Sequence, residues 1–305
     1  MDPLISAQIV TAAAQDLLFA LAVGSAACTA LFRQTGVTAP AATLRGLQIG
    51  AWGGLLLASL AALWLQTMLM SGASFATAGQ SVGVVLRQSH YGRTWLLGLT
   101  GLLLALRGSL GRPRSLFLGL LGALAYVAGR AAASHAADAG DFSVAEGVHT
   151  VHLLATALWA GCVIGTACLC GRRGRLAQLL PTPEQAAGFR IKLSKLASAA
   201  LAVVVATGLY NAVHDTAQVG SAWLATDWGH LLAVKIVLVI LALMLAGLNR
   251  VENVPALHHL LRTGAKSDTA IRRFDHWLIG EAVVMVLILV VAAMLGHTAP
   301  VMPAG

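Results

Sequence analysis

Long uninterrupted runs of apolar residues alternate along the chain with short segments that hold most of the charged residues. A helix needs about 20 apolar residues to cross the hydrocarbon core of a membrane. The runs predict eight such helices, over about 5–32, 46–70, 94–111, 115–136, 145–170, 193–214, 228–249 and 277–297. The runs are continuous rather than alternating, and lipid offers no partner to an unpaired backbone, so helices are predicted rather than strands.

Composition agrees with this pattern. The 305 residues are 58% hydrophobic and 10% charged, with a mean hydropathy of +0.79. A soluble domain carries about 25% charged residues, so soluble enzymes and secreted disulfide scaffolds are excluded. The four cysteines all lie within apolar runs. We therefore expect an all-α, polytopic membrane protein that forms one integral membrane domain over 1–305, in contact with the lipid bilayer.

The basic residues are sorted by membrane side. Sixteen of the twenty Lys and Arg residues fall in the loops after the first, third, fifth and seventh predicted helices or beside them. The positive-inside rule places these four loops in the cytoplasm and both termini outside. The net charge of +8 therefore reflects topology, and no nucleic-acid partner is expected.

Short sequence matches suggest an internal repeat. A Gly-containing segment precedes the third and seventh predicted helices (Tyr91-Gly92 and Trp228-Gly229), and a histidine follows the fourth and eighth (His135 and His297). Two parallel four-helix halves, 1–140 and 141–305, would explain these matches, an arrangement that some transporters use.

Histidine and methionine gather at the predicted outer ends of the helices. Seven of the ten histidines lie there, and Met68 and Met70 close the second helix. Imidazole and thioether together suit copper. Single histidines at an interface, such as His90 and His214, are more often solvated anchors. The candidate copper ligands are His135, His149, His152, Met68, Met70, His230 and His297.

The fifth predicted helix carries the most specific pattern. His149 and His152 are three residues apart and so project from one face, and Glu146 precedes them by the same spacing. A carboxylate beside an imidazole can fix its tautomer. A short loop joins His135 to this helix, so we expect His135 and His152 to lie within reach of one site.

Other polar groups inside the apolar runs are candidates for a path through the membrane, because ionisable residues there are costly. Asp16 is too short to reach an interface and would balance a cation, carry a proton or pair with Arg130 or Lys235. Thiols near the inner ends of helices would suit departing Cu(I), although cysteine is also a common packing residue. The candidates are Asp16, Lys235, Glu281, Cys28 and Cys168.

Several segments resemble the CopD (PcoD-type) copper-resistance membrane proteins, most clearly over about 130–297. The first of them are His135 in Ser-His-Ala-Ala, His152 through Trp159 to Gly161, Lys195-Leu-Ala and Thr207-Gly208-Leu209. Further along are Thr226 to Gly229 leading to Lys235, then Asn249-Arg250 and Glu281. One earlier segment, His90 to Trp95, also matches. One departure is His149, where the family carries an acidic residue three positions before the histidine that matches His152.

The resemblance implies a multi-pass protein of the bacterial inner membrane that moves copper from periplasm to cytoplasm and works with a periplasmic, copper-binding CopC-like protein. No catalytic triad or nucleotide-binding pattern is present, so we do not expect an enzyme. Two alternatives stay open. The outer histidines would also suit haem b in a membrane cytochrome, or a copper-delivery assembly factor without a conducting path.

Overall fold

The structure is a computed structural model that describes residues 2–36, 41–111, 115–134, 140, 142–171, 175–219, 223–263 and 268–298. All regular structure among these residues is helical. The longer helices are α1 (Pro3–Arg33), α2 (Ala41–Ser71), α4 (His90–Leu110), α5 (Leu116–Ala132), α6 (Val144–Gly171), α8 (Pro183–Val219), α9 (Asp227–Leu248) and α11 (Asp268–Leu295). Three shorter ones are α3 (Gly79–Gln88), α7 (Arg175–Leu179) and α10 (Val254–Thr263).

The all-α membrane architecture is confirmed. Each of the eight predicted ranges lies mainly within one of the eight longer helices, and six helical segments of the described chain are long and apolar enough to cross a membrane. These segments contain α1, α2, α6, α8, α9 and α11. Helix α5 is apolar but has only 17 residues, and α4 carries Arg93 and Arg107 near its ends. Eight crossings therefore stay a prediction, as does the orientation.

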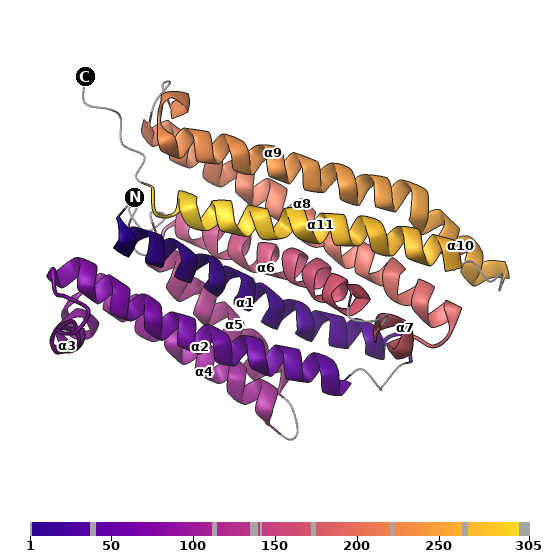
Figure 1. Ribbon diagram of the computed structural model, residues 1–305, viewed down its shortest axis with the longest axis horizontal. Coiled ribbons are helices and arrows are strands. Elements are labelled where there is room, and N and C mark those ends of the chain that lie inside the picture. Colours follow the sequence, from indigo (N-terminus) through magenta and orange to yellow (C-terminus); the bar gives the residue numbers. More distant parts are fainter. Residues whose placement is uncertain are drawn as a thin grey trace.

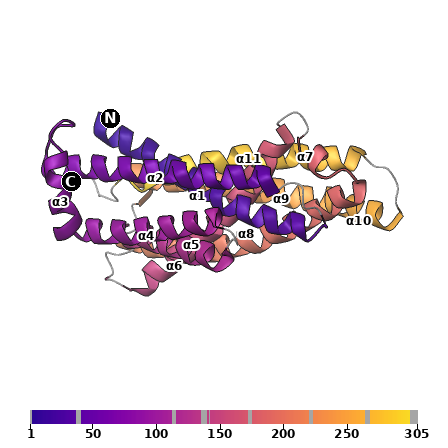
Figure 2. The same ribbon diagram turned by 90° about the horizontal axis from the view of Figure 1, so that it is seen from below.

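The long helices lie side by side along one axis (Figure 1). Helix α1 begins at the end of the bundle where α11 finishes, and α10 lies at the opposite end (Figures 1 and 2). We call these the N-terminal end and the α10 end. Helices α4, α6 and α9 begin at the N-terminal end, so His149 and His152 lie near it.

Helices α1 and α6 cross at two glycines in the middle of the bundle. A Cβ atom on Gly161 would lie 1.8 Å from the carbonyl oxygen of Ala20, and one on Gly24 would lie 2.0 Å from the carbonyl carbon of Gly161. Backbone contact of this kind is the usual way in which membrane helices associate. These two helices open the two predicted halves; the internal repeat itself stays a prediction.

Short polar side chains cap several helices at their first turn. The hydroxyl of Ser89 accepts from Gly92 N at the start of α4, and that of Thr226 accepts from Gly229 N at the start of α9. Ser143 does the same for Glu146 N in α6. Such caps satisfy N–H groups that have no partner within the helix. They set where each helix starts, and hence the depth of every side chain along it.

A π-helical turn, η3 (Asn249–Asn253), connects α9 to α10. Pro255 follows it. A proline inside a helix donates no hydrogen bond, and its ring clashes with the carbonyl four residues earlier, here that of Val251. The wider turn accommodates this proline and directs Asn249 and Arg250 toward the neighbouring helices.

Candidate functional site

The first turn of α6 fixes the position of the two predicted copper ligands. Ser143 caps this turn, and the Glu146 carboxylate accepts a hydrogen bond from Phe142 N at 2.7 Å. Glu146 therefore anchors the start of the helix. The predicted role of Glu146 as a partner of the imidazoles stays a prediction.

His149 and His152 lie together on one face of α6, as their spacing predicts. Their rings are nearly parallel, with centroids 6.4 Å apart and planes at 17°. The side chain of His152 is buried and that of His149 is half-buried. The pair therefore faces the inside of the bundle rather than lipid.

Helix α8 supplies a polar partner for each ring. Thr207 Oγ1 lies 3.0 Å from His152 Nδ1, and Asn211 Nδ2 lies 3.3 Å from His149 Nδ1. Gly208 lies between them in sequence, and a Cβ atom there would be 3.1 Å from His152 Cε1. The sequence analysis did not identify Thr207 or Asn211 as site residues. Thr207 and Asn211 are one helical turn apart, and this spacing was the sequence feature that could have identified them.

The hydrogen bonds of Thr207 determine the tautomer of His152. Thr207 Oγ1 donates its single proton to Val203 O at 2.6 Å, so toward His152 it acts as an acceptor. This arrangement favours the tautomer of His152 that carries its proton on Nδ1, which leaves a lone pair on Nε2. Neutral imidazole in this state is a metal ligand, and the bond at Nδ1 orients the ring.

Asn211 can support either tautomer of His149. Its amide donates through Nδ2 or, after a rotation of 180°, accepts through Oδ1. The amide therefore permits His149 to present Nε2 in the same way as His152.

An ion pair between α1 and α5 lies near the two histidines. Arg130 Nη2 contacts Asp16 Oδ1 at 2.9 Å, and Arg130 Nη1 donates to Gln15 Oε1 at 2.8 Å. Gln15 in turn donates to Ser59 Oγ on α2 at 3.2 Å. Of the three roles considered for Asp16, pairing with Arg130 is therefore observed.

Lys235 connects this ion pair to the histidines. It lies close enough to Asp16, His149 and His152 for its charge to affect all three. Polar groups from α1, α5, α6, α8 and α9 thus share one region near the N-terminal end.

The other predicted copper ligands do not form a pair like that of His149 and His152. Met68 is half-buried and Met70 is 49% exposed, both on α2, while His230 and His297 are exposed. His135 lies outside the described residues. No group of three or more His, Cys, Asp and Glu side chains that could hold a metal occurs in the described part of the chain.

Comparison with known families covers most of the chain. Residues 1–144 match the family described as copper resistance protein D-like, N-terminal domain, and residues 187–295 match copper resistance protein D. The chain belongs to the CopD copper-resistance family. No curated protein and no solved structure matches it.

Membership of the CopD family establishes a membrane protein of copper resistance and transport. Asp16 lies in the N-terminal match, while Lys235 and Glu281 lie in the second. Residues 145–186 lie between the two matches. This interval holds nearly all of α6, with His149 and His152.

The two cysteines named as stations for departing copper, Cys28 and Cys168, lie in different surroundings. Cys28 and Cys162 are both buried and their thiols are in contact, across α1 and α6. The Cys28 thiol also lies 3.6 Å from Thr166 Oγ1. Cys168, named with Cys28 as a station for departing copper, is exposed on another face of α6. The sequence could not show that Cys28 meets Cys162, because they are far apart along the chain.

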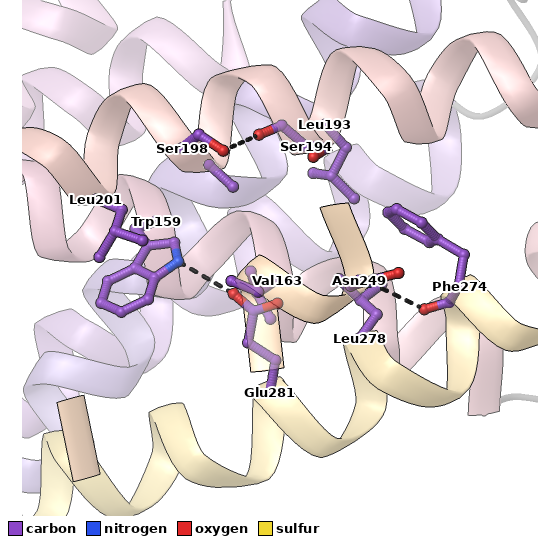
Figure 3. A pocket seen from close by; sticks show the side chains of 12 residues that line it. Trp159, Val163, Leu193, Ser194, Ser198, Leu201, Asn249, Phe274, Leu278 and Glu281 are labelled. Atoms are coloured by element: carbon purple, nitrogen blue, oxygen red, sulfur yellow. Dashed lines mark hydrogen bonds between the residues drawn. The ribbon is translucent and has the colours of Figure 1, made fainter. Parts of the chain in front are cut away.

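A second polar site lies deeper in the bundle, at Glu281 on α11. Glu281 is 4% exposed, and its Oε1 accepts from Trp159 Nε1 on α6 at 3.2 Å. A cavity of about 30 Å³ lies beside them, between α6, α8, α9 and α11 (Figure 3). Its polar lining residues are Ser194, Ser198, Asn249 and Glu281. Glu281 was a predicted path residue, whereas Trp159 was noted only within a segment that resembles the family.

Proposed function

We propose that this CopD family member moves copper from the outer face of the bacterial inner membrane toward the cytoplasm, and that His149 and His152 receive it. The observation that carries the proposal is the pair of nearly parallel imidazoles on α6, one buried and one half-buried, each with a side chain of α8 beside its Nδ1. Fixing Nδ1 leaves Nε2 for the metal, as in other histidine sites.

Two imidazoles can supply the first two ligands of a copper site. Copper accepts nitrogen from imidazole and sulfur from thioether. We propose that His135 adds a third ligand, because it precedes α6 by a short loop. His297, His230, Met68 and Met70 would receive copper before it reaches the pair.

The charged residues beside the site determine the electrostatic barrier for a cation that moves inward. A cation that leaves His152 inward must pass the positive charges of Arg130 and Lys235. Asp16 offsets part of this charge through its contact with Arg130. We therefore propose that Asp16 lowers the electrostatic barrier for copper on this path.

The orientation that supports import follows from the basic residues. Arg250 and Arg262 lie in η3 and α10, and Arg272 and Arg273 lie in the first turns of α11, next to α10 in sequence. The positive-inside rule assigns this α10 end to the cytoplasm. The N-terminal end would then face the periplasm, where a CopC-like protein could deliver copper.

A transport assay with the purified protein in liposomes tests the proposal. The His149→Ala/His152→Ala variant should lose copper binding and copper uptake, measured by elemental analysis of the vesicles. The matched control is His258→Ala/His259→Ala, which removes two exposed histidines of α10 at the opposite end and should transport normally. Equal uptake by the two variants would exclude the His149–His152 site.

The same preparation separates transport from the two alternatives. A Soret band with stoichiometric iron would identify a haem protein instead. Copper binding that depends on His149 and His152, without uptake into vesicles, would favour an assembly factor that delivers copper.

A further inference from the structure

We propose that Glu281 is a proton-binding residue that exchanges its proton with the α10 side of the membrane through the adjoining cavity, and so couples proton movement to transport. The coupling rests on the proposed transport function; the proton-binding role does not. Glu281 takes no part in the copper site described above.

Among the described residues, no ion pair involves the carboxyl group of Glu281. It is 4% exposed within a membrane-spanning segment, and its printed partner is the neutral indole N–H of Trp159. The ion pairs found in the described chain involve Asp16 and Asp275 instead. A charged carboxylate in such surroundings is costly unless paired. The neutral, protonated form is therefore favoured.

The neighbouring elements present few charges to this carboxyl group. From α6 it meets Trp159 and Val163, and from α8 Ser194 and Ser198. On α11 itself, Asp275 is held by Arg190. On α1, Asp16 is held by Arg130, while Cys28 contacts Cys162. Beside the cavity lining, the Arg250 guanidinium donates to Ser194 O and Ser198 Oγ.

The cavity is suited to a proton rather than to a metal cation. Ser198 Oγ already donates to Ser194 O, and Asn249 donates to Phe274 O (Figure 3). Ser198 Oγ also accepts from Arg250, and Asn249 accepts from Asn253. Few oxygens remain for a metal, and the Arg250 guanidinium repels a cation. Soft Cu(I) also disfavours oxygen ligands.

The cavity offers a way out for the proton. Its volume of about 30 Å³ is enough for one or two waters, each of which needs roughly 10–15 Å³ by the same measure. Ser194, Ser198 and Asn249 line this cavity together with Glu281, and Asn249 begins the π-helical turn that leads into α10. A carboxyl proton passes to a water there, which leaves a carboxylate that still accepts from Trp159.

Two features connect this site to the copper ligands. Trp159 lies seven residues after His152, two helical turns further along the same face of α6. Asn249 begins the π-helical turn, and such turns occur frequently at functional sites. A movement of α6 or α9 during transport would therefore alter the surroundings of Glu281.

Infrared spectroscopy of the purified protein tests proton binding without copper. The carbonyl stretch of a protonated buried carboxyl should appear and titrate with pH in the native protein and be lost in Glu281→Gln. Glu184→Gln, an exposed acid on α8, is the control and should keep the band. The Trp159→Phe variant should shift the band to higher frequency, because the carbonyl loses its hydrogen-bond donor.

Liposomes that hold a pH-sensitive dye test the coupling. Copper uptake by the native protein should change with an imposed pH gradient, and Glu281→Gln should remove that response, while copper binding at His149 and His152 is retained. A carboxyl band unchanged in both Glu281→Gln and Trp159→Phe would overturn the proposal, as would a full gradient response in Glu281→Gln. A band that depends on Glu281, without copper uptake by the native protein, would instead refute the transport function.

Discussion

Thr207 on α8 fixes the protonation pattern of His152 on α6. Because the hydroxyl donates to Val203 O at 2.6 Å, it can only accept from His152 Nδ1, which lies 3.0 Å away. A single hydroxyl thus leaves Nε2 as the ring nitrogen with a lone pair. The candidate copper ligand is therefore held ready by a residue on another helix.

The Thr207→Val variant should weaken copper binding. Valine keeps the shape of threonine but cannot accept the Nδ1 proton, so the ring loses its orientation. Loss of such a supporting group typically costs about 10- to 100-fold in metal affinity, and we expect the lower part of this range. Competition with a Cu(I) chelator measures the change. Thr207→Ser keeps the acceptor and should bind nearly as the native protein does; equal loss in both variants would argue against this role.

The Gly161→Ala variant should destabilise the bundle. The new Cβ would lie 1.8 Å from Ala20 O, so α1 and α6 must separate. Overpacking of this kind costs roughly 1–3 kcal/mol, and backbone contact places this case at the upper end. Thermal unfolding in detergent measures it. Gly165→Ala, where the Cβ meets nothing within 4 Å, is the control and should unfold at the native temperature.

The Asp275→Asn variant should separate α8 from α11 at the α10 end. Arg190, which is 3% exposed, makes two hydrogen bonds to the Asp275 carboxylate, at 2.8 and 2.6 Å. Removing one partner of a buried pair leaves an uncompensated charge and costs about 3–5 kcal/mol. Chemical denaturation should show a loss of this order. Stability close to that of the Glu184→Gln control would mean that the pair contributes little.

The Asp16→Asn variant should impair copper uptake more than copper binding. Arg130 and Lys235 would then place an uncompensated positive charge on the path, while the imidazole ligands stay in position. One unpaired positive charge close to the path changes the rate of copper transfer on the order of tenfold. Uptake into liposomes and equilibrium binding should be measured together. Adding Arg130→Gln removes the excess charge and should restore much of the uptake; normal uptake by Asp16→Asn would remove this residue from the path.

The predicted helices agree well with the structure because each reflects a property of a single segment. Apolar length sets a membrane helix, and the cap residues Ser89, Ser143 and Thr226 mark where helices begin. The common face of His149 and His152 likewise follows from helical periodicity. The amphipathic helix α3 and the π-helical turn near Pro255 were not predicted, since each depends on the segments around it.

The sequence by itself determined the class of protein, the helical segments and the histidine pair on α6, because hydropathy and periodicity act locally along the chain. Only the tertiary structure decided which partners meet across helices. Thr207 with His152, Arg130 with Asp16, Cys162 with Cys28 and Trp159 with Glu281 all join residues on different helices. The physical reason is that helix packing, set here by backbone contact at Gly24 and Gly161, fixes the rotation and depth of each helix. No local pattern encodes that choice.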